Sequence, residues 1–160
     1  MLNDLIDKLP DGRAENALVN EMRRLTEHEK EAVIESILLH HSDLVSGSVL
    51  RIIPRVVKDT GVLIRFLDRG LEKKTVNGAR FWIKATVGGL GYKRLLNHLK
   101  EIAEREPEWI VHAWYHLPPL VRREAPEYMP VLEKICAIVD ARVTPDLRDF
   151  WQRNKDAVPL

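Results

Sequence analysis

Two histidines and a glutamate recur at a spacing of four in the segment PEWIVHAWYH, residues 107–116. Glu108, His112 and His116 would stack along one face of a helix, opposite its apolar stripe. A carboxylate and two imidazoles are acceptable ligands for zinc. However, the order E-x3-H-x3-H differs from the H-E-x-x-H arrangement, in which the glutamate sits between the histidines. Because only His98 offers itself as a further ligand, we predict a polar helix face, with no metal site and no cofactor.

The other residue types that support catalysis occur without the neighbours that catalysis needs. Cys136, the single cysteine, lies at the edge of an apolar helical stripe, which favours a small core residue over a nucleophile. The sequence GGLG at 88–91 lacks the Lys-Ser/Thr pair and the preceding strand of a phosphate-binding loop. Asp59 and Asp68 are the only aspartates in the central third, and neither has a distinguishing context. We therefore predict no catalytic residues and no enzymatic activity.

The strongest candidate for a binding surface is a set of cations in the central third of the chain. Residues 51–100 hold 12 Lys and Arg against 3 Asp and Glu, whereas acidic residues outnumber basic ones on both sides. Such asymmetry indicates an anionic partner. We use the term basic ridge for the cations that helical patterns place on polar faces of this region. They are Arg51, Arg55, Lys58, Arg80, Lys84, Lys93, Arg94 and Lys100.

The spacing of these cations follows the helical repeat. In RIIPRVVKDTG, residues 51–61, a helical wheel gathers the apolar residues on one arc and the cations on the other. Pro54 shares the cationic side, so it removes one backbone bond on the solvated face and bends the helix while the apolar face still packs. Over residues 76–87, Arg80 and Lys84 form a narrow cationic strip on a helix that is otherwise apolar and expected to be nearly buried.

A second pair of arginines in this region is expected to be neutralised locally. Arg65 and Arg69 are followed three residues later by Asp68 and Glu72, a spacing that places opposite charges side by side on a helix. We therefore expect local ion pairs here and leave these arginines out of the basic ridge.

Helical periodicity dominates the whole chain, and no convincing alternation of period two is present. Thr26 and Glu29 fit a capping box at a helix start. The glycines around Gly91 mark a break, and Pro118–Pro119 is expected to end the helix before it. We predict a single all-α domain over residues 1–160 with a short tail at 155–160. The expected helices are 2–9, 13–25, 28–40, 43–58, 61–73, 76–87, 91–105, 108–117, 126–141 and 145–154.

The predicted helices begin at intervals that are typical of a helical-hairpin repeat of about 30–37 residues. Short helical hairpins with a proline inside one helix, as at Pro54, resemble HEAT-like repeats. The resemblance implies a short α-solenoid, a stack of antiparallel helical hairpins. It also implies a binding role, because HEAT-like arrays are mostly scaffolds for proteins or nucleic acids. A non-repeating helical bundle is the alternative.

These observations lead to a hypothesis about function and compartment. The lone cysteine, the acidic start and the lack of a long apolar run favour a cytoplasmic protein with no membrane association. We predict a binding module of the adaptor, inhibitor or immunity type that recognises an acidic protein partner through the basic ridge. Nucleic-acid binding along the same ridge is the alternative. A remote alternative is an enzyme resembling HEAT-like DNA glycosylases, which need a carboxylate inside a cationic groove.

Overall fold

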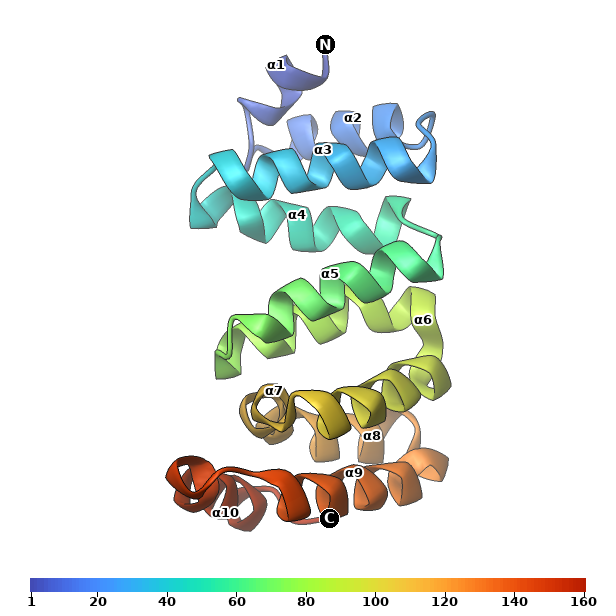
Figure 1. The fold of residues 1–160 in the computed structure, drawn as a ribbon. Coiled ribbons are helices and arrows are strands. Elements are labelled where there is room, and N and C mark those ends of the chain that lie inside the picture. Colours follow the sequence, from blue (N-terminus) through green and yellow to red (C-terminus); the bar gives the residue numbers. More distant parts are fainter. The chain divides into compact units, whose positions relative to one another are not determined.

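The computed structural model describes all 160 residues, which form helices joined by short links, with no strand (Figure 1). This confirms the all-α class. Contacts divide the chain into two compact units, residues 1–66 and 67–160. A single domain over residues 1–160 stays a prediction. None of the helices is both long enough and apolar enough to cross a membrane.

The first unit holds four helices and the start of a fifth. They are α1 (Leu2–Ile6), α2 (Gly12–Met22), α3 (Glu27–His40), α4 (Asp43–Val56) and α5 (Thr60–Glu72), which continues into the second unit. Helix α4 packs against both α2 and α3, and α3 and α4 lie side by side in Figure 1. The predicted capping box is confirmed, since Thr26 accepts from the Glu29 N–H while Glu29 accepts from the Thr26 N–H.

Helix α4 is amphipathic in the way the sequence predicts. Val49, Ile52, Ile53 and Val56 are each at most 1% exposed, so this arc forms the core of the unit. Pro54 lies inside the helix on its exposed side. The missing N–H of a proline is tolerated there because the opposite face still packs.

The second unit contains the end of α5 and five further helices. These are α6 (Val76–Arg105), α7 (Pro107–Ala113), α8 (Leu117–Glu124), α9 (Met129–Arg142) and α10 (Arg148–Ala157). Three 3-10 turns, Trp114–His116, Pro126–Tyr128 and Pro145–Leu147, join them. Helix α6 packs against α7 and α9, and α7 and α8 also contact α9. Near α10, the buried rings of Trp114 and Trp151 meet edge to face with centroids 5.2 Å apart.

Two glycines of this unit have defined structural roles. Gly91 breaks α6 with φ 77° and ψ 157°, a backbone region essentially restricted to glycine. The break that the sequence predicts is therefore confirmed, and it falls at Gly91 while Gly88 stays helical. In α5, a Cβ at Gly70 would collide with the Trp82 side chain, so glycine permits a close approach between α5 and α6.

The sequence prediction is wrong at three places in this unit. Pro118 and Pro119 begin α8 rather than ending a helix, because proline is tolerated in the first turn, where an N–H has no helical partner. Phe81 is 50% exposed, so the α6 segment around Arg80 and Lys84 is less buried than expected. Helix α10 continues to Ala157, and the C-terminal tail therefore starts beyond it and not at residue 155.

Candidate anion-binding site

The cations of the basic ridge are divided between the two units. Arg51, Arg55 and Lys58 belong to the first unit, and the remaining members, Arg80, Lys84, Lys93, Arg94 and Lys100, belong to the second. We therefore consider them as two separate sets.

The arginines of the first unit are engaged within the protein. Arg51 donates from Nε and Nη2 to Oε2 of Glu15, at 3.2 and 2.9 Å, and Glu15 is only 8% exposed. Arg55 Nη1 lies 3.8 Å from Glu15 Oε1, and its Nη2 donates to Asn16 at 3.0 Å. The shortage of acids in residues 51–100 predicts that these two arginines lack an acidic partner, and this prediction is wrong. The acid comes from α2, far away in sequence, and no spacing rule within α4 reveals it.

The local pairing predicted for Arg65 is also wrong. Arg65 instead donates from Nε and Nη2 to both carboxylate oxygens of Glu31, at 2.6 and 2.7 Å. These hydrogen bonds raise the pKa of Arg65 and lower the pKa of Glu31. Asp68, the expected partner, lies with its Oδ1 2.6 Å from Nε2 of His98. This contact occupies Nε2 of His98, so His98 is not available as a metal ligand.

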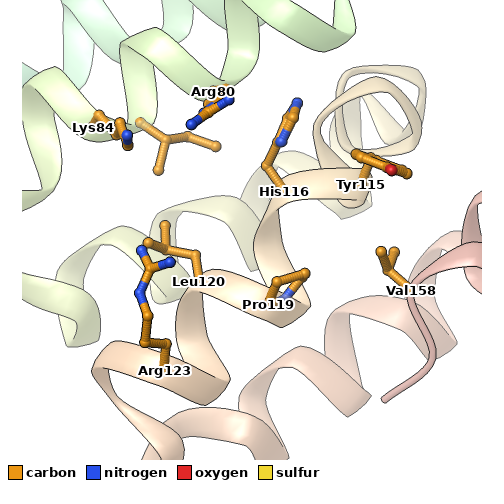
Figure 2. A pocket seen from close by; sticks show the side chains of 9 residues that line it. Arg80, Lys84, Tyr115, His116, Pro119, Leu120, Arg123 and Val158 are labelled. Atoms are coloured by element: carbon orange, nitrogen blue, oxygen red, sulfur yellow. The ribbon is translucent and has the colours of Figure 1, made fainter.

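In the second unit, Arg80 and Lys84 line a pocket of about 290 Å³. Figure 2 shows that both side chains project from α6, while Arg123 projects from α8 and His116 from the 3-10 turn before α8. The residues that line the pocket are Arg80, Ile83, Lys84, Tyr115, His116, Pro119, Leu120, Arg123 and Val158. No acidic side chain is among them, so the pocket wall is cationic over an apolar floor.

The cations of this pocket are largely free to bind a ligand. Arg80 and Lys84 are exposed and make no ion pair within the protein. Arg123 Nε lies 3.0 Å from Oε1 of its neighbour Glu124, but both side chains are largely exposed. Exposed pairs of this kind contribute about 0–1 kcal/mol, so an incoming anion can displace or share this contact.

His116 lines the same pocket, but its Nε2 atom is buried and does not face the open space of the pocket. Its Nε2 is inaccessible to solvent and has no hydrogen-bond partner. Burial lowers the pKa of His116, the Val76 backbone acts in the opposite direction, and the charge of Arg80 adds to the lowering. The lowered pKa favours the neutral ring over the imidazolium. Because Nε2 is not accessible to solvent, a ligand in the pocket does not reach it in this conformation.

The stack of Glu108, His112 and His116 expected from the sequence does not form. Helix α7 ends at Ala113, which carries His116 off the face shared by the other two. Glu108 pairs with Lys74 at 2.9 Å, and His112 contacts the Glu108 carbonyl and the Phe150 ring. Nowhere in the chain do three His, Cys, Asp or Glu side chains gather in a group that could hold a metal ion.

The remaining sequence candidates lie outside the pocket. Lys58, Lys93 and Arg94 are exposed and Lys100 is half-buried, and none of them lines the pocket. Burial raises the pKa of the Cys136 thiol, and the nearby carboxylate adds to this effect. The thiol form is therefore favoured, in keeping with the expectation that Cys136 is not an activated nucleophile.

Sequence reasoning missed Arg123, Tyr115 and the apolar floor of the pocket. Arg123 lies in the acidic C-terminal third, and a helix end predicted at Pro118–Pro119 leaves its helix unrecognised. A proline pair followed by a short amphipathic stretch and two arginines, PPLVRRE, is the signal that would have indicated α8. Comparison with protein-family models, curated proteins and solved structures finds no match to this chain.

Proposed function

We propose that the protein is a non-enzymatic binding module that recognises an acidic protein partner through the cationic pocket of its second unit. The observation that carries this proposal is that Arg80, Lys84 and Arg123 line one pocket that has no acidic lining. Complementary charge speeds association and selects the partner. Within the basic central third, the proposal thus assigns the binding role to Arg80 and Lys84.

The pocket is of a size that one anchoring side chain of a protein partner can fill. At about 290 Å³ it lies just below the range of roughly 300–1,000 Å³ that is usual for small-molecule sites. It can take one side chain and part of its neighbour. Protein interfaces commonly concentrate their binding energy in such small pockets, each filled by one anchor residue.

The architecture is consistent with this role. We propose that the helices form a short HEAT-like array, supported by Pro54 inside α4 and by the spacing of successive helices. Such arrays present side chains on a rigid frame, as an adaptor, inhibitor or immunity-type protein requires. The single cysteine cannot form an internal disulfide, which favours a cytoplasmic location.

Nucleic-acid binding is the less favoured alternative. A strand of nucleic acid is held by cations that follow its phosphates, and often by aromatic rings that stack on its bases. Here Arg80 and Lys84 lie over an apolar floor formed in part by Leu120 and Pro119. In the first unit, Arg51 and Arg55 already hold Glu15.

The test is affinity capture from a lysate, with and without nuclease, using wild type and Arg80→Glu/Lys84→Glu. The control is Lys134→Glu/Arg153→Glu, which changes the net charge equally at exposed residues of the same unit that do not line the pocket. A protein that resists nuclease, binds wild type and the control, and is lost from the Arg80/Lys84 variant supports the proposal. Equal capture by both variants, or capture that nuclease abolishes, overturns it.

A further inference from the structure

The arrangement of side chains around the pocket defines two ends with different chemistry. In Figure 2, Lys84 and Arg123 lie at the left, and Tyr115 and Val158 lie at the right. Leu120 is drawn beside Arg123, and Pro119 lies between Leu120 and Val158. The pocket is therefore cationic at one end and apolar along its floor. A ligand that fills it needs an anionic group with an apolar group close by.

Glu124 argues for a ligand group with a single negative charge. It lies at the edge of the site, bound to Arg123 and exposed to solvent. A phosphate group carries nearly two negative charges at neutral pH and is repelled more strongly by a neighbouring carboxylate than a carboxylate ligand is. The exposed contact between Arg123 and Glu124 shows that this guanidinium can bind a carboxylate.

We propose that the pocket binds the carboxylate of one Asp or Glu of the partner, next to an apolar residue, and this rests on the function proposed above. Arg80, Lys84 and Arg123 surround the carboxylate. The neighbouring apolar side chain covers Leu120 and Val158. The inference specifies an acidic–apolar pair as the anchor of the partner.

The experiment is an NMR titration of the intact protein with short blocked peptides that contain Glu-Leu, Gln-Leu or phosphoserine-Leu. We expect the Glu-Leu peptide to shift the ring signals of His116 and Tyr115 with a Kd of about 1 mM, at least about tenfold tighter than the Gln-Leu peptide. The shifts should be lost in Arg80→Glu/Lys84→Glu and kept in Lys134→Glu/Arg153→Glu.

Three results would overturn this inference. They are equal shifts from the Glu-Leu and Gln-Leu peptides, no shifts from Glu-Leu at about 10 mM, and tighter binding of the phosphoserine peptide. Failure of this inference differs from failure of the proposed function. If a captured partner depends on Arg80 and Lys84 but Glu-Leu causes no shift, only the anchor is wrong. If Glu-Leu binds and no protein is captured, the proposed function is wrong.

Discussion

Asp140, on α9, accepts hydrogen bonds from two side chains of the last helix, α10. Its Oδ1 accepts from Trp151 Nε1 at 2.7 Å and from Lys155 Nζ at 2.6 Å. Burial acts to raise the pKa of Asp140, but the hydrogen bonds from Lys155 and Trp151 outweigh it, so the pKa lies below its ordinary value. Trp151 is 2% exposed, and its indole N–H depends on this carboxylate. The contact therefore anchors α10 to α9.

Removal of this carboxylate should destabilise the protein. Asp140→Ala leaves the Trp151 N–H buried without a partner, which is expected to lower the free energy of unfolding by about 1–3 kcal/mol. Urea denaturation measures this loss. Glu133→Ala, at an exposed site of the same helix, is the control and should stay within about 0.5 kcal/mol of wild type. Equal midpoints for the two variants would show that Asp140 has no anchoring role.

The same carboxylate makes stability depend on pH with a defined sign. Because the folded state lowers the pKa of Asp140, the unfolded chain binds more protons in acid. The stabilisation is complete above the unfolded value of about 3.9 and is lost as the pH falls through the folded value. The difference in stability between wild type and Asp140→Ala should therefore shrink in acid. A difference that stays constant from neutral pH to about pH 2 would contradict this assignment.

Helix α6 contains one glycine position that only glycine fits well and another that can accept a side chain. Gly91 has φ 77°, which an L side chain rarely adopts, whereas Gly88 is helical and exposed, with open space where a Cβ would lie. Gly91→Ala should destabilise the protein by about 1–3 kcal/mol because it strains the break. Gly88→Ala should stabilise it by about 0.5–1 kcal/mol, since alanine is the better helix former. Denaturant midpoints of the two variants should move in opposite directions, and a shared direction would place the break elsewhere.

The helices show which local features can be predicted from sequence. Thr26 and Glu29 predict the start of α3, and the glycines predict the break at Gly91, because each feature depends on neighbours only a few residues away. Pro118–Pro119 is ambiguous, since proline suits both the first turn of a helix and the position after its end. The break after Ala113 carries His116 to the pocket, and no residue type in the sequence indicates it.

At the scale of the whole molecule, the charge pattern was predictable and the ion pairing was not. Residues 51–100 are strongly basic, and this is evident from composition alone. Whether a given cation is available depends on acids that folding brings from distant elements. Glu15 on α2 holds Arg51, and Glu31 on α3 holds Arg65, in each case across more than 30 residues of chain. Arg80 and Lys84 receive no such acid.

This difference predicts that two charge reversals of equal size affect stability unequally. Arg51→Glu/Arg55→Glu places two acids beside Glu15, whose side chain is 11% exposed. It should lower the free energy of unfolding by about 1–3 kcal/mol, because a mostly buried carboxylate loses its partners. Arg80→Glu/Lys84→Glu breaks no internal pair and should stay within about 0.5 kcal/mol of wild type. Urea denaturation of both variants at low ionic strength makes the comparison. If both variants lose stability equally, the cations of the pocket serve the fold, and the case for a binding site there is lost.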